Sequence, residues 1–171
     1  MAEAQRLRGK SAIVTGAASG FGAGIARRFV EEGARVAIVD KNIASAEALA
    51  AELGASAMAL ACDVSSARDV EAVRDATLAR FGRIDILVNN AAVPQSPTPL
   101  EEVEEDVFDR LLAVNVKALY VASRAIVPVM RAGGGGAIVN IGSTGGVRPR
   151  PNLTWYNATK GFVLTATKAM A

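Results

Sequence analysis

The chain has 171 residues, a formal net charge of +2, no histidine and one cysteine, and 51% of its residues are apolar. This length and apolar content predict one domain with a substantial core. The absence of histidine excludes a Ser-His-Asp triad and imidazole metal sites, so we expect no metal ion. The lone Cys62 can form no internal disulfide, which favours a reducing, cytoplasmic setting.

Charge and hydropathy patterns also bear on partners. Acidic and basic residues are interspersed, and the few aromatic residues are not interleaved with arginines, so we expect no nucleic-acid partner. The first ten residues are polar, unlike a signal peptide, and no apolar run approaches the length that crosses a bilayer. We therefore expect no membrane association.

Short apolar runs alternate with longer helical patterns along the chain. The predicted strands are Ser11 to Thr15, Arg35 to Val39, Ser56 to Ala61, Ile84 to Val88 and Ala137 to Ile141. The predicted helices are Phe21 to Glu32, Ile43 to Leu53, Ala67 to Phe81, Val103 to Met130, and one that begins near Trp155. This order predicts a doubly wound, Rossmann-type α/β domain over residues 1–171, with about five parallel strands covered on both faces.

A glycine-rich loop, Thr15 to Gly22, follows the first strand and opens directly into a helix. Glycines let a backbone approach a pyrophosphate, whose charge is met by free N–H groups at the positive helix end. A tight strand-to-helix connection with no ligand explains the same pattern. If a dinucleotide binds, we expect contacts from Gly16, Ser19, Gly20, Phe21 and Gly22.

Asp40 ends the second predicted strand, about twenty residues further on, where a carboxylate can bind both hydroxyls of an adenosine ribose. It would repel a 2′-phosphate, so NAD is favoured over NADP, although the adjacent Lys41 would offset part of that repulsion. The alternative is a solvated acid at a strand end. Asp63 and Val64 follow the third strand, and Asn90 follows the fourth, where they would lie against the base and ribose. Either segment alone is an ordinary turn more often than a site.

Asn115 interrupts an apolar stripe on the long predicted helix. The stripe consists of Phe108, Leu111, Leu112, Leu119 and Ala122. A buried asparagine is costly unless its amide is hydrogen-bonded. Asn115 therefore either braces the backbone or serves a polar site.

Tyr156 and Lys160 stand four residues apart in the last predicted helix, so their side chains emerge on one face. A nearby ammonium favours the phenolate form of a tyrosine, and the pair fits a general acid/base built without histidine. An ordinary amphipathic helix with a surface lysine explains the spacing alone. Ser143 follows the fifth strand, and its hydroxyl would face the same crevice as the pair.

Taken together, these residues resemble the short-chain dehydrogenases/reductases. Thr15 to Gly22 matches the family's T-G-x-x-x-G-x-G loop, and Tyr156 to Lys160 matches its Y-x-x-x-K motif. Asn115 and Ser143 fall where the family places its other two catalytic residues. One position departs, because the family's N-N-A-G is Asn89 to Ala92 here, and we expect only a slight backbone adjustment at Ala92.

The resemblance implies hydride transfer between NAD(H) and a secondary alcohol or ketone, with Tyr156 as general acid/base. It implies that Lys160 lowers the tyrosine pKa and holds the nicotinamide ribose, that Ser143 binds the substrate oxygen, and that Asn115 holds a relay water. It also implies a homodimer or homotetramer. Within this class, a 3-oxoacyl thioester reductase is the alternative to an alcohol dehydrogenase.

Family members run to about 250 residues by this resemblance, so we expect an N-terminal portion that lacks the last family strands and most of the substrate pocket. A dinucleotide-binding fragment or sensor without catalysis is the alternative, and the presence of all four catalytic residues argues against it. A methyltransferase on a similar sheet is disfavoured, because its cofactor has no pyrophosphate or nicotinamide. The identity of the substrate cannot be read from these residues.

Overall fold

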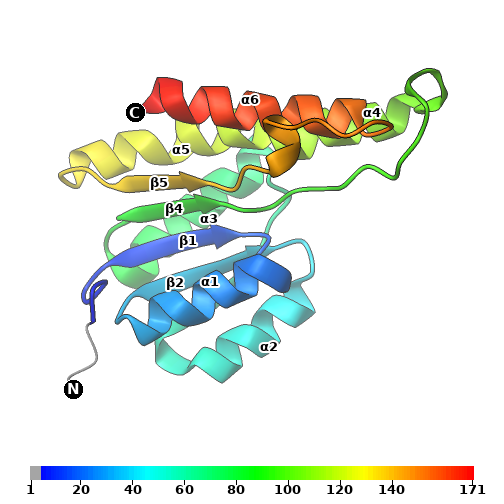
Figure 1. Cartoon of the computed structure of the whole chain (residues 1–171). Helices are drawn as coiled ribbons and strands as arrows, with labels where there is room; N and C mark the ends of the chain where they lie inside the picture. Colours follow the sequence, from blue (N-terminus) through cyan, green and yellow to red (C-terminus); the bar gives the residue numbers. More distant parts are fainter. Residues whose placement is uncertain (1–4) are drawn as a thin grey trace.

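The computed structural model describes residues 5–171, which form a five-stranded parallel sheet with helices on both faces (Figure 1). The strand order is β3-β2-β1-β4-β5, and every neighbouring pair is parallel. The strands are β1 (Ser11–Thr15), β2 (Arg35–Asp40), β3 (Ala57–Ala61), β4 (Ile86–Asn89) and β5 (Ala137–Asn140). The predicted doubly wound α/β fold is confirmed.

Helices connect successive strands and cover the sheet. They are α1 (Gly20–Glu31), α2 (Ile43–Leu53), α3 (Ala67–Phe81), α4 (Glu105–Leu112), α5 (Ala118–Ala132) and α6 (Thr154–Met170). Three short 3-10 turns are η1 (Gly54–Ser56), η2 (Leu100–Glu102) and η4 (Thr144–Gly146). Apolar side chains of α1 and α2 pack on one face of the sheet, and those of α3 and α5 pack on the other.

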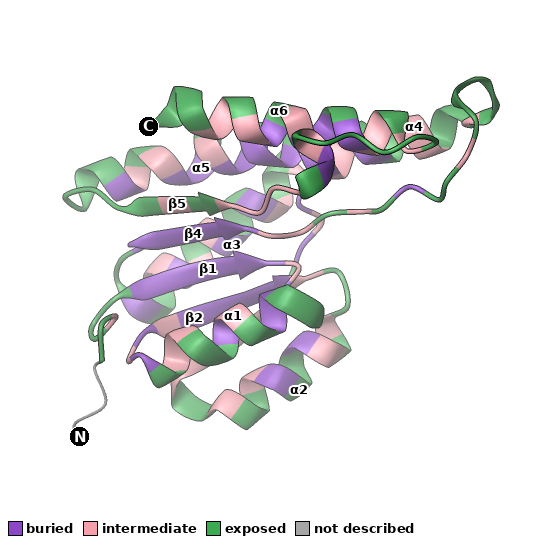
Figure 2. Ribbon diagram, in the orientation of Figure 1, coloured by how far each residue is buried: buried purple, intermediate pink, exposed green. Residues whose placement is uncertain are grey.

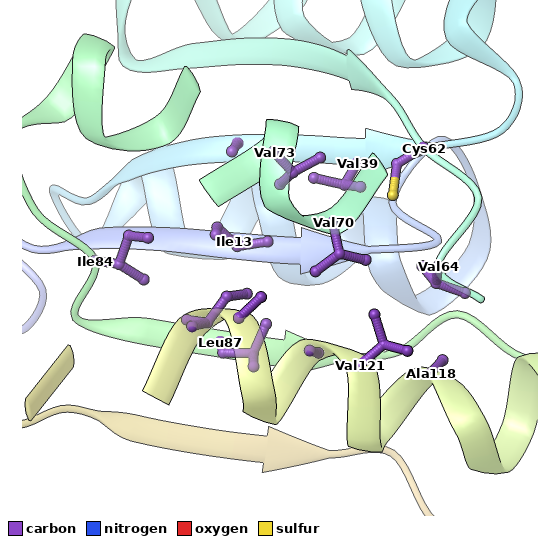
Figure 3. Close-up of a cluster of buried hydrophobic side chains, with 14 of the residues drawn as sticks. Ile13, Val39, Cys62, Val64, Val70, Val73, Ile84, Leu87, Ala118 and Val121 are labelled. Atoms are coloured by element: carbon purple, nitrogen blue, oxygen red, sulfur yellow. The ribbon is translucent and has the colours of Figure 1, made fainter. Parts of the chain in front are cut away.

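The core on the α3 and α5 face is continuous from the sheet to both helices. Figure 3 shows Ile13 and Leu87 of the sheet facing Val70 of α3 and Val121 of α5. Successive residues of β1 point to opposite faces, so Ile13 lies in this cluster while Ala12 and Val14 lie in the other. This two-sided burial explains why the central strands are apolar throughout.

The strands differ in burial, as Figure 2 shows. All five residues of β1 are buried, whereas β5 alternates between half-buried and exposed residues and Val139 is 43% exposed. The fourth strand begins at Ile86 and not at the predicted Ile84. Just before the strand, the buried Asp85 carboxylate accepts a hydrogen bond from the Ser11 backbone N–H at 2.9 Å.

The predicted single helix over Val103 to Met130 is wrong in one respect. A π-helical turn, η3 (Ala113–Lys117), lies between α4 and α5. Its wider turn changes the phase of the apolar stripe, so Leu112 is 39% exposed while Asn115 is buried. Helical spacing of the apolar residues on either side of the turn continues, so the hydropathy pattern does not distinguish it from an α-helix.

The helical run Glu105–Ala132 has 28 residues and, by length and composition alone, is apolar enough to cross a membrane. The expectation that no apolar run approaches that length is therefore wrong. In this structure several of its apolar side chains, such as Val121 and Ile126, are buried in the core on the sheet. Its apolar character is accounted for by this packing.

Candidate functional site

A crevice lies at the carboxyl ends of the strands β1 to β4. Its volume, including the open mouth, is about 830 Å³. Six of the predicted cofactor-binding residues line it, namely Gly16, Ser19, Asp40, Asp63, Val64 and Asn90. The structure thus brings together residues from four separate strand ends, as the topology of a doubly wound sheet requires.

Two glycines allow the crevice to form because a side chain at either position would collide with backbone or a neighbouring side chain. A Cβ on Gly16, whose φ is +61°, would lie 2.7 Å from the Ala91 Cα. A Cβ on Gly22 would lie 2.6 Å from the Asn90 Nδ2 and would also overlap the Gly16 carbonyl oxygen. The loop is therefore packed against the end of β4 through atoms that only glycine leaves free.

The other two predicted loop residues act differently. Gly20 has a φ of +55° with open space around its Cα, so backbone conformation alone requires glycine there. Phe21 is 84% exposed at the start of α1 and lies outside the lining of the crevice.

Asn90 braces the glycine loop. Its Nδ2 donates to the Thr15 and Gly16 carbonyl oxygens at 2.8 and 2.9 Å. The Thr15 hydroxyl in turn accepts from the backbone N–H groups of Asn90 and Ala91 at 3.0 and 3.1 Å. The side-chain nitrogen of Asn90 is thus engaged by the protein, and the residue shapes the crevice.

Asp40 and Lys41 lie side by side at the crevice but have separate partners. The Asp40 carboxylate accepts from the Ala18 and Asn42 backbone N–H groups at 3.0 and 2.9 Å. The Lys41 Nζ lies 2.8 Å from an oxygen of Asp63. The hydrogen bond from Lys41, followed by those from Ser65, lowers the pKa of Asp63 to about 2. The lysine ammonium is therefore paired with Asp63.

Lys160 ties α6 to the end of β5. It is buried, and its Nζ donates to the Ile141 carbonyl oxygen at 2.8 Å. Burial lowers the pKa of Lys160, because a low-dielectric environment disfavours the ammonium. Ser143 lies two residues beyond Ile141, and its hydroxyl accepts from the Gly145 N–H at 3.1 Å. The contact made by Lys160 thus holds the Tyr156 helix beside the Ser143 loop.

Asn115 braces the backbone, which was one of the two roles open to it. Its Oδ1 accepts from the Val93 N–H at 2.8 Å, and its Nδ2 donates to the Val93 carbonyl at 3.0 Å and the Thr159 hydroxyl at 3.2 Å. The Thr159 hydroxyl donates to the Tyr156 carbonyl at 2.7 Å. Asn115 therefore joins η3, the loop after β4 and α6 through one buried amide.

Sequence reasoning missed two residues of this network, Gln95 and Thr159. Both are buried, and the Gln95 Oε1 accepts from the Tyr156 backbone N–H at 2.9 Å. Thr159 stands three residues after Tyr156, so helical spacing offered a signal for it. Gln95 lies in an irregular loop 61 residues away from Tyr156, where no periodicity points to it.

Comparison with known proteins agrees with this geometry. A family model described as short chain dehydrogenase matches residues 10–171. The chain is 45% identical over 168 residues to 4-formylbenzenesulfonate dehydrogenase of Comamonas testosteroni, covering 96% of this chain and 67% of that protein. It is 45% identical over 169 residues to D-threitol dehydrogenase of Mycolicibacterium smegmatis, covering 97% of this chain and 65% of that protein.

A solved structure gives a similar result. The 3-ketoacyl-(acyl-carrier-protein) reductase of Brucella melitensis, complexed with NADH, superposes with a TM-score of 0.94 at 50% identity. The alignment covers 96% of this chain and 70% of that one. The chain thus spans about two thirds of the length of the proteins that it matches.

Proposed function

Because the chain belongs to the short-chain dehydrogenase family, we propose that it carries the dinucleotide-binding domain and catalytic residues of an NAD(H)-dependent oxidoreductase acting on a secondary alcohol or ketone. The observation that carries this proposal is the link between α6 and the sheet edge. Lys160 bonds to the end of β5, which pairs with β4 where β4 enters the crevice. Lys160 thereby fixes α6 at the sheet edge whose neighbouring strand, β4, ends at the crevice.

The residues of the crevice fit such a cofactor. The close approach at Gly16 and Gly22 keeps the loop free of side chains where a pyrophosphate would meet the start of α1. Gly20 and Phe21 complete that loop, Asp40 would hold the adenosine ribose, and Asp63 and Val64 would border the base. When bound, the nicotinamide would supply or accept the hydride.

Four side chains have roles in proton transfer and orientation. Tyr156 would exchange a proton with the substrate oxygen, and Ser143 would hydrogen-bond the same oxygen. The Lys160 ammonium would favour the phenolate of Tyr156 and bond to the nicotinamide ribose hydroxyls. Asn115 would keep η3 and α6 in register and hold a water that connects Lys160 to solvent.

The substrate class that we propose is a polyol or related secondary alcohol, as the name of the threitol dehydrogenase suggests. NAD reduction in the presence of D-threitol and other polyols, measured on the longest form of the protein that the gene encodes, tests this. Tyr156→Phe should lower kcat by at least about 100-fold, because the proton donor is lost, and should change the NADH Kd by less than about threefold. Tyr120→Phe removes the only other tyrosine, which is 60% exposed, and serves as the matched control.

Activity of Tyr156→Phe close to that of Tyr120→Phe would show that the role of Tyr156 is wrong. A second candidate, 3-oxoacyl thioester reduction, is favoured by the 50% identical reductase complexed with NADH. Oxidation of NADH by an acetoacetyl thioester, with no reduction of NAD by polyols, would select it. NADH binding without turnover in either assay would favour the non-catalytic alternative.

We propose NAD over NADP because Asp40 borders the expected ribose position while Lys41 is paired with Asp63. Asp40→Ser should bring the Kd of NADPH closer to that of NADH by at least about tenfold, because it removes a charge that repels the 2′-phosphate. Fluorescence titration with both reduced cofactors measures the ratio. An unchanged ratio would contradict this preference. Glu47→Gln, a change of the same charge on α2, is the control.

Assembly and setting are also part of the proposal. We propose a homodimer or homotetramer and a cytoplasmic location, in which the buried Cys62 stays reduced. Burial raises the pKa of the Cys62 thiol to about 12, so its reactive thiolate is scarce. Sedimentation at several concentrations would establish the assembly.

A further inference from the structure

The loop Val93 to Thr98 connects the crevice to the start of α6. Val93 lines the crevice and is bonded at both its N–H and its carbonyl to Asn115. Two residues further on, the Gln95 side chain reaches the Tyr156 backbone. One short segment therefore borders the cofactor site and contacts the helix of the proposed proton donor.

Helix α6 begins without a cap from its own flanking residue. Leu153 precedes it and makes no side-chain cap hydrogen bond within the described chain. The first backbone bond of the helix is from the Asn157 N–H to the Leu153 carbonyl at 2.9 Å. The N–H of Tyr156 stands before that bond, so it needs a partner from outside the helix. The Gln95 Oε1 supplies this partner at 2.9 Å.

Gln95 is itself held firmly. It is 6% exposed, and its Nε2 lies 3.4 Å from the Asn152 carbonyl oxygen, which also accepts from the Thr98 N–H at 2.9 Å. Asn152 has a φ of +61° and is the only non-glycine residue with positive φ in residues 5–171. Such a conformation persists where surrounding bonds hold it. The same loop thus fixes both the bend before α6 and the first turn of α6.

We propose that Gln95 is a positioning residue for Tyr156, which caps the first turn of α6 and sets its place relative to the crevice. The inference rests on the proposed role of Tyr156 in proton transfer. Gln95 touches no reacting atom; it acts through the backbone N–H of the residue that would do so. Displacement of a reacting group by about 1 Å costs up to about 100-fold in rate, so such a brace has a measurable effect.

Two variants separate the cap from simple packing. Gln95→Met keeps the length of the side chain and removes the acceptor, whereas Gln95→Glu keeps an acceptor at the helix N-terminus, where negative charge is favourable. Thr98→Val is the matched control in the same loop, because among residues 5–171 the Thr98 hydroxyl bonds only to the nearby Ser96 carbonyl. Hydrogen exchange of the Tyr156 amide is measured in each protein, with the Val163 amide in the middle of α6 as internal reference.

We expect Gln95→Met to speed exchange of the Tyr156 amide by at least about tenfold and to leave the Val163 amide unchanged, because one hydrogen bond is lost locally. Gln95→Glu should restore slow exchange in part, because it keeps the acceptor for the Tyr156 N–H but loses the donor to the Asn152 carbonyl. With a substrate that the wild type turns over, Gln95→Met should lower kcat by at least about tenfold, with the NADH Kd within about twofold and partial rescue in Gln95→Glu.

Two results would overturn the inference: Tyr156 exchange in Gln95→Met equal to that of wild type, or equal acceleration at Tyr156 and Val163, which would indicate general loss of stability. The exchange measurement needs no turnover. Failure of the cap is therefore distinguishable from failure of the proposed oxidoreductase activity, which the Tyr156→Phe assay tests.

Discussion

The crevice at the strand ends and the start of α6 are built in opposite ways. The crevice depends on the absence of side chains at Gly16 and Gly22, which lets the loop pack against the end of β4. The start of α6 depends on side-chain hydrogen bonds, which Gln95 and Asn115 make to it from other elements. A methyl group added at Gly16 or Gly22 would therefore disturb the crevice, and loss of the Gln95 or Asn115 amide would disturb the start of α6.

This difference decides what the sequence reveals. A glycine pattern lies within eight consecutive residues, so it can be recognised in the amino-acid sequence alone. The amide contacts of α6 join residues 61 and 44 positions apart. Asn115 is marked by its place on an apolar stripe and Thr159 by helical spacing, whereas no periodicity points to Gln95. Sequence patterns therefore identify candidate residues on regular elements and miss a partner that lies in an irregular loop.

The largest effect should come from adding one methyl group to the crevice. Gly22→Ala would place a Cβ 2.6 Å from the Asn90 Nδ2 and 2.8 Å from the Ala17 Cα, so the loop must shift. We expect the NADH Kd to rise by at least about 100-fold, measured by fluorescence titration. Gly24→Ala is the control, because its Cβ would have no neighbour within 4 Å. Similar NADH affinities of the two variants would show that close packing at Gly22 does not matter for cofactor binding.

A smaller effect should follow from removing the amide that braces η3. Asn115→Leu removes the partner of the half-buried Val93 N–H and carbonyl and one of the two bonds of the buried Thr159 hydroxyl. We expect the free energy of unfolding to fall by about 2 kcal/mol, measured by urea denaturation. Ser123→Ala removes one bond to the preceding turn of α5 and should cost about 1 kcal/mol or less. Equal losses of unfolding free energy in the two variants would contradict the bracing role of Asn115.

The smallest effect concerns the ion pair at the rim of the crevice. Lys41 and Ser65 lower the pKa of Asp63 to about 2 from an ordinary value of about 3.9. The ionised form is thus stabilised in the folded state, so this contribution is fully present above about pH 4 and is lost as pH falls through 2. Lys41→Met should be less stable than wild type near neutral pH, and this difference should shrink toward pH 2. A difference that does not depend on pH would contradict the ion pair.

Much of the fold followed from local pattern. The bounds of α2 and α3 match the predicted ranges, since each is preceded by a side chain, Asn42 or Ser66, that caps its first turn. The π turn at Asn115 was not predictable, because one polar residue on an apolar stripe is equally compatible with an uninterrupted α-helix. The predicted fourth strand begins two residues early, because the buried Ile84 extends the apolar pattern beyond the strand itself, which starts at Ile86.

In the candidate site, too, some features followed from local pattern and others depended on packing. Six of the predicted cofactor residues line one crevice, because a parallel sheet brings its strand ends together. The position of Lys160 against the Ile141 carbonyl, and the engagement of Lys41 by Asp63, depend on how the side chains pack. Neither contact is encoded in a spacing.

A crystal structure with NADH tests most directly whether the crevice and the Tyr156 helix form one site. We predict the adenosine ribose at Asp40, the pyrophosphate at the start of α1, and the nicotinamide end beside Tyr156 and Lys160. A dinucleotide whose nicotinamide points away from Tyr156 and Lys160, with its adenosine seated at Asp40, would contradict it.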